Sequence, residues 1–273
     1  MSALATLSTP APDTDAVVDV RGADKLFANG TRALGPVDLT IRGGEFVTVL
    51  GPSGCGKSTL LKMIANLVAP TSGALSWWRG GFDHVGAPGK RLVMVFQDPT
   101  LMPWARVQRN VRLPLDLART PRAEADARVA AALALVGLTG FETHYPRQLS
   151  GGMQMRVSIA RALVTEPNLL LMDEPFGALD EITRNKLDAE LIELWWKRKL
   201  TVVFVTHSIY EAIFLSTRVV VMAARPGRVL GDVAIDEPHP RTEGFRLSQQ
   251  FAAHAKALSE LLAEGTSQGA SRQ

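Results

Sequence analysis

The stretch GPSGCGKST, residues 51–59, decides the fold of this chain. It follows the apolar run Phe46–Leu50 and overlaps the start of a helical pattern over Lys57–Val68, so its glycines are expected in a loop between a strand and a helix. A loop whose backbone N–H groups wrap a phosphate needs residues without bulky side chains, and the helix that follows directs its positive N-terminal end at the anion. The spacing G-x-x-x-x-G-K-S/T therefore predicts a phosphate-binding loop and a nucleotide site.

The residue types in this loop have separate chemical roles. Lys57 is expected to reach the β- and γ-phosphates, and the hydroxyl of Ser58 to ligate Mg²⁺. Cys55 has two interpretations: a small side chain tolerated in the loop, or a reactive thiol whose pKa is lowered by the helix terminus and Lys57. The predicted ATP-binding residues of the loop are Gly51, Pro52, Ser53, Gly54, Cys55, Gly56, Lys57, Ser58 and Thr59.

Outside the loop, strand-like runs alternate with helical patterns. Several of these runs are continuously apolar, which is typical of strands covered on both faces of a parallel sheet. The alternation predicts an α/β fold with a mainly parallel sheet. The strand-like runs are Val17–Arg21, Val37–Ile41, Phe46–Leu50, Leu92–Phe96, Leu169–Met172, Thr201–Thr206 and Arg218–Met222, and the helical patterns are Lys57–Val68, Ala123–Val136, Met153–Leu163, Glu181–Lys197 and Phe245–Leu262.

The pattern changes between Gln97 and Leu149, where the sequence becomes helical and rich in alanine. We expect residues 98–166 to form a helical subdomain inserted into a nucleotide-binding α/β core. This core would comprise residues 17–97 and 167–235. The Ser/Thr/Pro/Ala composition of residues 1–16 predicts a flexible leader, and residues 236–273 are expected to form a C-terminal helical tail.

Composition and charge disfavour several classes of protein. The 273 residues include 30 basic and 27 acidic side chains of interspersed sign, so we expect no nucleic-acid partner. The single cysteine excludes an intrachain disulfide and a cysteine-based zinc site. No run approaches the roughly 18 apolar residues needed to span a bilayer, and the N-terminal residues lack the regions of a signal peptide. We therefore expect a cytoplasmic protein.

Polar side chains follow three of the other predicted strands. The stretch LLLMDEP, residues 169–175, is an apolar run that ends in Asp173 and Glu174, and burying two carboxylates is costly unless a cation or hydrogen bonds offset it. Beside a phosphate-binding loop, Asp173 is placed to hold Mg²⁺ and Glu174 to orient or deprotonate an attacking water. Gln97 and His207 also follow apolar runs, at the strand ends where parallel sheets bind ligands.

These stretches, in this order, resemble the ATP-binding subunits of ABC transporters over residues 17–235. GPSGCGKST is similar to the Walker A loop, LLLMDEP to Walker B, and LSGGMQMR, residues 149–156, to the signature motif. GALD, residues 177–180, resembles the D-loop. The resemblance implies a P-loop NTPase fold with an antiparallel β portion near the N-terminus, and it implies ATP and Mg²⁺ as cofactors.

The resemblance also assigns roles to individual residues. The aromatic ring of Phe27 is expected to stack on adenine, although a core aromatic is the alternative, and Met155 departs from the family pattern, which often has glutamine there. The implied catalytic residues are Glu174, His207 and Gln97; the implied metal ligands are Ser58, Gln97 and Asp173; the D-loop residues are Ala178, Leu179 and Asp180; and the signature residues, which meet the ATP of a second subunit, are Leu149, Ser150, Gly151, Gly152, Met153 and Gln154.

Three further segments resemble the nitrate/sulfonate/taurine import group, which includes importers of thiamine-pyrimidine precursors. They are LMPWARVQRNV (101–111), VTHSIYEAIFLSTRVVVMAARPGRV (205–229) and IDEPHPR (235–241). The resemblance implies a peripheral ATPase on the cytoplasmic side of the inner membrane that closes as a head-to-tail homodimer. It implies contact with an integral-membrane permease through the region Gln97 to Val111, and indirectly with an extracytoplasmic solute-binding protein.

Four alternatives remain less favoured. ABC ATPases of DNA repair or chromosome organisation insert long coiled coils, whereas Gln97 and Leu149 are only 52 positions apart. ABC proteins of translation normally join two cassettes in one chain. A nucleotide-binding scaffold without turnover would not need Glu174 and His207, and an unrelated P-loop kinase or GTPase would leave LSGGMQMR unexplained.

Overall fold

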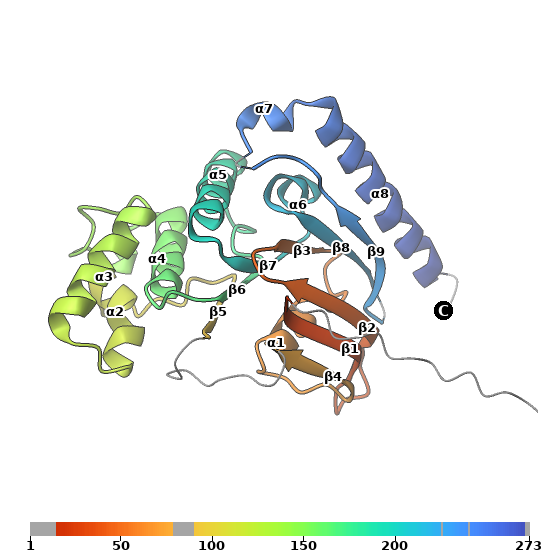
Figure 1. Ribbon diagram of the computed structural model, residues 1–273, viewed down its shortest axis with the longest axis horizontal. Helices are drawn as coiled ribbons and strands as arrows, with labels where there is room; N and C mark the ends of the chain where they lie inside the picture. The colour runs from red at the N-terminus through yellow and green to blue at the C-terminus, as the bar shows by residue number, and fades with distance from the viewer. Residues whose placement is uncertain (1–14, 79–89, 225, 240, 271–273) are drawn as a thin grey trace, which may run out of the picture.

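The computed structural model describes residues 15–78, 90–224, 226–239 and 241–270. Within these ranges the strands form a three-stranded antiparallel sheet, in the order β2-β1-β4, and a six-stranded sheet, in the order β5-β6-β7-β3-β8-β9 (Figure 1). The strands are β1 (Ala16–Leu26), β2 (Arg32–Arg42), β3 (Phe46–Leu50), β4 (Ser72–Trp77), β5 (Leu92–Val95), β6 (Leu169–Asp173), β7 (Thr201–Thr206), β8 (Arg218–Ala223) and β9 (Arg228–Ala234).

Helices connect these strands and cover the larger sheet (Figure 1). They are α1 (Lys57–Ile64), α2 (Val107–Leu117), α3 (Arg122–Leu135), α4 (Gly151–Leu163), α5 (Glu181–Arg198), α6 (Ile209–Leu215), α7 (Glu243–Arg246) and α8 (Gln249–Ala270), with a short 3₁₀ turn at Pro146–Gln148. No helix within the described ranges is both long and apolar enough to cross a membrane.

The larger sheet is parallel except at its last pair, where β9 runs antiparallel to β8. Its central strand β7 is buried on both faces. Val202 and Phe204 belong to one apolar core, shared with α5 and α6, and Val203 and Val205 belong to the other, shared with α1 and the antiparallel sheet. Because both faces are covered, the strand is continuously apolar, and the prediction of an α/β fold with a mainly parallel sheet is confirmed.

Helices α2, α3 and α4 lie together at one side of the larger sheet, next to β5 (Figure 1). Their apolar side chains join the same core as Phe204 and α5; Val111, Leu133 and Val157 are examples. The helical group inserted between β5 and β6 is therefore continuous with the α/β core in its packing. The exact division at residues 98–166 stays a prediction.

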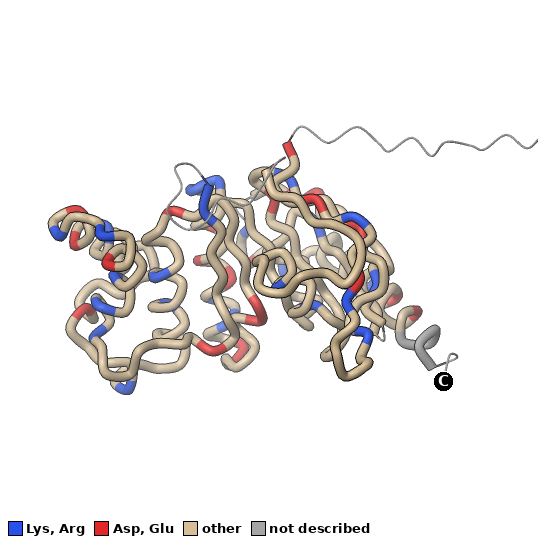
Figure 2. The backbone as a smooth tube through the Cα atoms, turned by 90° about the horizontal axis from the view of Figure 1, so that it is seen from below, with Lys and Arg blue, Asp and Glu red and all other residues tan. Residues whose placement is uncertain are grey.

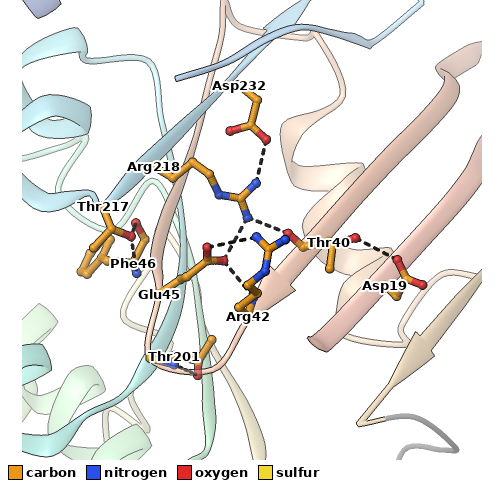
Figure 3. Close-up of polar contacts among 10 residues, drawn as sticks. Asp19, Thr40, Arg42, Glu45, Phe46, Thr201, Thr217, Arg218 and Asp232 are labelled. Carbon is orange, nitrogen blue, oxygen red and sulfur yellow. Dashed lines mark hydrogen bonds and ion pairs between the residues drawn. The ribbon is translucent and has the colours of Figure 1, made fainter. Parts of the chain in front are cut away.

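Arg218, at the start of β8, joins the two sheets (Figure 3). Its guanidinium donates a 2.6 Å hydrogen bond to the carbonyl of Thr40 in β2 and forms ion pairs of 3.0 Å with Glu45 and 2.7 Å with Asp232. Glu45 also accepts a hydrogen bond from the backbone N–H of Arg42. These contacts hold the antiparallel sheet against the N-terminal ends of the parallel strands.

Several element boundaries differ from the sequence expectations. The helix expected over Lys57–Val68 ends at Ile64, because Asn66 takes a left-handed φ of 56°. The helical pattern expected near Phe245–Leu262 is divided between two helices: α7 ends at Arg246 and α8 begins at Gln249. Residues 1–14, Arg225, Pro240 and residues 271–273, on which parts of the predicted leader, turn and tail fall, lie outside the described residues.

Basic and acidic residues are interleaved along the described chain (Figure 2). Many of them pair with each other on helix surfaces, as Arg112 does with Asp116 and Asp126 at 2.9 Å each. Such exposed pairs contribute little to stability and keep the surface of mixed sign. The absence of a nucleic-acid partner stays a prediction.

Candidate active site

The register of three neighbouring strands brings the candidate residues to one edge of the larger sheet. Leu50 of β3 lies opposite Thr206 of β7, and Asp173 of β6 lies opposite Val205 of β7. The phosphate-binding loop directly follows β3, Glu174 directly follows β6, and His207 directly follows β7. Since β6, β7 and β3 are adjacent and parallel, residues far apart in the sequence meet at their carboxyl ends.

Two glycines are needed where the backbone of the phosphate-binding loop packs closely against neighbouring atoms. A Cβ at Gly51 would lie 2.7 Å from Cys55 Sγ and 2.8 Å from the carbonyl oxygen of Met222. Gly56 has a φ of 94° at the start of α1, and a Cβ there would lie 2.6 Å from the carbonyl oxygen of Ala33. Both positions therefore exclude larger residues, and no side chain of the N-cap residue Gly56 caps the first backbone N–H groups of α1.

Lys57 lies within this loop with only 4% of its surface exposed. Its ammonium donates hydrogen bonds to the carbonyls of Gly51 at 2.8 Å and Pro52 at 3.0 Å, and it lies 3.4 Å from Glu174 Oε1. A buried cation with this many acceptors is held in place by the loop. It is positioned to meet the negative charge of a nucleotide phosphate.

Cys55 is fully buried beneath the turn that precedes β9. A Cβ at Gly227 would lie 2.1 Å from the Cys55 carbonyl oxygen, so this turn rests directly on the loop. Burial raises the pKa of the Cys55 thiol, and the lowering effect of Lys57 is smaller. The geometry favours the interpretation of Cys55 as a small packing residue over that of a reactive thiol.

Ser58 and Asp173 form the pair that the sequence assigns to the metal. The Ser58 hydroxyl donates a 2.8 Å hydrogen bond to Asp173 Oδ1. Burial raises the pKa of Asp173, while the hydrogen bond from Ser58 opposes the rise. Within the described ranges no group of three or more His, Cys, Asp or Glu side chains could hold a metal. One hydroxyl and one carboxylate fit Mg²⁺, which binds few protein oxygens when phosphates complete its coordination.

Glu174 and His207 face each other across the site. His207 Nδ1 lies 3.0 Å from Glu174 Oε2, and the backbone N–H of Glu174 donates to the carbonyl of Val205 at 3.0 Å. Glu174 has a φ of 44°, a left-handed conformation that few residues other than glycine adopt. The backbone strain turns the carboxylate away from the strand and toward Lys57 and His207. A carboxylate placed in this way can accept a proton or orient a water.

Gln97 and Phe27 are less closely tied to this cluster. Strand β5 ends at Val95, and exposed Phe96 separates it from Gln97. A Cβ at Gly177 would lie 3.8 Å from Gln97 Nε2, so the amide faces the start of the D-loop. Phe27 lies in the turn between β1 and β2 with 38% of its surface exposed, and Lys25 Nζ is 5.4 Å from the ring centroid. This exposure argues against the core interpretation of Phe27.

The signature motif lies at the start of α4, apart from the phosphate-binding loop. Ser150 is the N-cap of α4, and its hydroxyl accepts a 3.3 Å hydrogen bond from the Met153 N–H. A Cβ at Gly151 would meet only Leu179 Cδ2, at 3.8 Å, and one at Gly152 would lie 2.9 Å from Thr183 Cγ2. The signature glycines therefore pack against the D-loop and α5, and Gly151 is exposed and could carry a Cβ without a clash.

Two other signature residues serve the fold. The Gln154 side-chain amide donates to the carbonyls of Pro146 at 3.1 Å and Leu149 at 3.3 Å, which fixes the turn before α4. Met155 is buried in the core, which explains how a methionine is accepted where the family often has glutamine. The roles assigned to all these site residues stay predictions.

The D-loop is fixed by its own polar contacts. Asp180 is the N-cap of α5 and accepts a 3.0 Å hydrogen bond from the Thr183 N–H, which lowers its pKa. The carbonyl of Leu179 accepts a 2.8 Å hydrogen bond from Arg184. Ala178 lies between Gly177 and Leu179 in the turn that connects β6 to α5. The conformation of the D-loop is therefore fixed by hydrogen bonds within one chain.

Sequence reasoning missed a cluster of charged residues behind His207. Glu211 accepts a hydrogen bond from Thr206 and lies 3.6 Å from Arg184, while Asp188 pairs with Arg246 at 2.9 Å. Both carboxylates are buried. Burial raises the pKa of Asp188 to about 8, with Glu211 adding to the rise and Arg246 opposing it. The sequence does contain a signal for this cluster: Arg184 and Asp188 fall on the same face of the predicted helix as apolar Leu191, where charged side chains would be buried.

Comparisons with known proteins agree with this arrangement. The family model described as ABC transporter matches residues 34–177. An uncharacterised ABC transporter ATP-binding protein of Methanocaldococcus jannaschii is 47% identical over 246 residues, which is 89% of this chain and 90% of that protein. The aliphatic sulfonates import ATP-binding protein SsuB of Bacillus cereus is 42% identical over 237 residues, which is 86% of this chain and 92% of that protein.

Solved structures show the same fold. A dimeric structure of the bacterial ABC transporter cassette MJ0796 has a TM-score of 0.70 and 34% identity, covering 81% of this chain and all of that one. A dimeric post-hydrolysis state of that cassette, bound to ADP and Pi, has a TM-score of 0.69 and 33% identity over the same share of each chain. This chain belongs to the ABC transporter family, as one of its ATP-hydrolysing ATP-binding subunits.

Proposed function

We propose that this chain powers an importer of a small solute by hydrolysing Mg-ATP as a head-to-tail dimer on a membrane permease. One observation carries the proposal. Lys57, Asp173 and Glu174 converge at the carboxyl ends of the parallel strands, whereas Ser150 and Gly151 lie exposed at the start of α4, next to the D-loop. The site within one chain therefore lacks its second half.

The converging residues divide the chemistry among them. Lys57 and the loop amides bind the phosphates. Ser58, Asp173 and Gln97 would hold Mg²⁺, which would neutralise phosphate charge when bound. Glu174 orients and deprotonates the attacking water. His207, held 3.0 Å from Glu174, contacts the γ-phosphate.

The second half of the site comes from another copy of the chain. The first-turn N–H groups of α4, a helix of 13 residues, form an anion site capped by Ser150 and open at Gly151. In the dimer this terminus meets the γ-phosphate bound by the loop of the partner. Support comes from the similar cassette MJ0796, whose solved structure is dimeric.

The region from Gln97 to Val111 is the proposed permease contact. Trp104 projects from it with 76% of its surface exposed. Asn110 is fully buried and ties the loop from within: its amide N–H groups donate to the carbonyls of Met102 and Ala105, and its oxygen accepts from the Met102 N–H at 2.7 Å. A rigid loop that displays an exposed tryptophan is a suitable docking surface.

We assign the solute to the nitrate, sulfonate, taurine or pyrimidine-precursor type. Relatives at 42% identity from two Bacillus species carry aliphatic sulfonates import in their names. The chain would then act at the cytoplasmic side of the inner membrane, on a permease that an extracytoplasmic binding protein supplies with solute. No nucleic acid takes part.

Substitution of the proposed catalytic base tests the ATPase and the dimer together. Glu174→Gln removes the base but keeps the shape of the side chain. We expect ATP binding to persist, a dimer to accumulate with Mg-ATP in light scattering, and turnover to fall by a factor of about 100 or more. Near-normal hydrolysis would contradict the assigned role, and a persistent monomer would contradict the head-to-tail site.

The importer role needs a transport measurement. The chain is co-produced with a candidate permease and solute-binding protein, and uptake of labelled sulfonate, nitrate and pyrimidine precursors is compared. Trp104→Ala should abolish uptake while the ATPase activity of the isolated chain stays unchanged. Uptake that is indifferent to Trp104 would contradict the proposed docking surface.

A further inference from the structure

Two charged residues link the D-loop to the segment that carries His207. Arg184 lies in the first turn of α5, and Glu211 lies in the first turn of α6, beside it (Figure 1). Glu211 is only 5% exposed, and its Oε1 is 3.6 Å from Arg184 Nε. A buried carboxylate is costly without a partner, so this pair is a constrained part of the structure.

Glu211 holds the chain on both sides of His207. The Thr206 hydroxyl donates to Glu211 Oε2 and accepts a 3.0 Å hydrogen bond from the Ser208 N–H. The Ser208 hydroxyl in turn accepts a 3.3 Å hydrogen bond from the Glu211 N–H. The residues immediately before and after His207 are thereby fixed to α6. Glu211 consequently sets the position of the imidazole that lies 3.0 Å from Glu174.

Arg184 connects Glu211 to the D-loop. Its guanidinium donates to the Leu179 carbonyl at 2.8 Å, in the D-loop. The Leu179 side chain is the nearest neighbour of a Cβ placed on Gly151 of the signature motif, at 3.8 Å. Arg184 therefore makes two contacts at once, one toward the signature motif and one toward Glu211. A planar guanidinium can bridge two acceptors in this way, and an ammonium in its place cannot reproduce both contacts.

We propose that Arg184 and Glu211 are positioning residues that couple the signature motif to His207 within one subunit. The inference rests on the proposed function, in which the signature motif binds the ATP of the partner and His207 holds the subunit's own ATP. When the dimer closes, a shift of Leu179 moves the guanidinium of Arg184. The ion pair with Glu211 carries that shift through Thr206 to His207, so each subunit links the two ATP sites.

The test uses Arg184→Lys, Glu211→Gln and the double variant in the purified full chain, with kcat, KM for Mg-ATP and Tm measured. Arg184→Lys should leave the fold intact, since an ammonium keeps a positive charge opposite Glu211, but it breaks the bridge. Each single change should lower kcat about tenfold with KM and Tm little altered. The double variant should be no slower than the slower single variant.

The opposite results are equally clear. A normal kcat in Arg184→Lys would show that only the positive charge at position 184 matters. Losses of kcat that multiply in the double variant would show that Arg184 and Glu211 act independently. Either result overturns the proposal. Thr206 provides a second route to the same answer. Thr206→Val should match Glu211→Gln in kcat, whereas Thr206→Ser, which keeps the hydroxyl, should retain activity. Normal turnover in Thr206→Val also overturns the coupling.

Arg218→Lys is the matched control, because Arg218 also joins a backbone carbonyl to carboxylates (Figure 3). It lies at the start of β8, away from the carboxyl ends of the parallel strands where the proposed site lies. Its kcat should stay within about twofold of the original chain. An equal loss in Arg218→Lys would mean that the Arg184 effect is a general packing effect, which overturns the proposal.

A Glu174→Gln background separates failure of the coupling from failure of the proposed function. Absence of an ATP-dependent dimer in Glu174→Gln alone contradicts the proposed function. If that dimer forms, it should form equally well when Arg184→Lys is added, because the bridge acts after assembly. A dimer that is lost only on adding Arg184→Lys overturns the coupling, since Arg184 would then serve assembly.

Discussion

Ser58 and Asp173 lie 115 positions apart in the sequence, and the Ser58 hydroxyl donates a 2.8 Å hydrogen bond to Asp173 Oδ1. One residue comes from the start of α1 and the other from the end of β6. Their contact exists because β3 and β6 are separated only by β7 and all three run in the same direction. The parallel register therefore builds the proposed metal site from two distant segments.

Lys57→Ala should weaken ATP binding. The ammonium is buried and already surrounded by the carbonyls of Gly51 and Pro52, so no other residue replaces it in the loop. Charge-assisted hydrogen bonds contribute about 1.5–3 kcal/mol each, which predicts a loss of roughly 10- to 100-fold in affinity. Nucleotide titration by fluorescence or calorimetry measures it. Lys256→Ala, an exposed lysine on α8, serves as control and should bind ATP normally.

Gly151→Glu should separate folding from dimerisation. The site has room for a side chain within one subunit, and an acidic residue in the first turn of α4 favours the helix dipole, so Tm should not fall. The same carboxylate would repel the phosphate of the partner's ATP. ATP-dependent dimerisation and turnover should both drop by a factor of about ten or more. Light scattering that shows an undiminished dimer would exclude the signature as a phosphate contact.

Asp188→Asn should change how stability depends on pH. Folding raises the pKa of Asp188 to about 8, from about 3.9 in the unfolded chain. At a pH between these two values, Asp188 is protonated in the folded chain and ionised in the unfolded chain. Stability from Asp188 is thus fully present below pH 4 and is lost as pH rises toward 8. Burial is the main cause; Glu211 on α6 adds to it, and Arg246 on α7 and Arg184 on α5 oppose it.

The measurement for Asp188 is Tm at several pH values. Asparagine cannot ionise, so the Tm of Asp188→Asn relative to the original chain should increase from pH 5 to pH 8. Glu193→Gln, at an exposed position of the same helix, is the control and should show a flat difference. A constant offset for Asp188→Asn across this range would mean that Asp188 ionises as easily in the folded chain as in the unfolded one.

Cys55 should resist alkylation in the folded chain. The thiol is fully buried and its pKa is raised by burial, so little thiolate meets the reagent. Iodoacetamide labelling at pH 8, followed by mass spectrometry, should be more than about tenfold slower in the folded than in the urea-unfolded chain. ATPase activity should survive the treatment. Rapid labelling with loss of activity would restore the reactive-thiol interpretation.

Contiguous motifs were the features most accessible to prediction. Phe46–Leu50 and Thr201–Thr206 are strands at the predicted bounds, because burial on both faces makes a strand continuously apolar. Strand β9 escaped prediction because none of its residues is fully buried and it lacks a long apolar run. The break between α7 and α8 is not visible in the C-terminal pattern, because Leu247 at the break is apolar in the sequence and yet exposed in the structure.

Contacts between distant segments were less accessible. An arginine at 184 and a glutamate at 211 are ordinary helix residues when each is seen in its own segment. Their pairing depends on α5 and α6 lying side by side, and the burial of Glu211 depends on packing that no local pattern reveals. The phosphate-binding loop could be recognised because its function requires a fixed local spacing, whereas this pair requires only proximity.

Asn110 has a consequence for the rate at which the proposed membrane partner would dock. Its hydrogen bonds to Met102 and Ala105 hold the loop around Trp104 in shape as part of folding, so the loop loses its conformational entropy before any encounter. Association then depends on collision and orientation rather than on a slow ordering step. Loosening the loop at Asn110 would lengthen the search while leaving the contact surface itself intact.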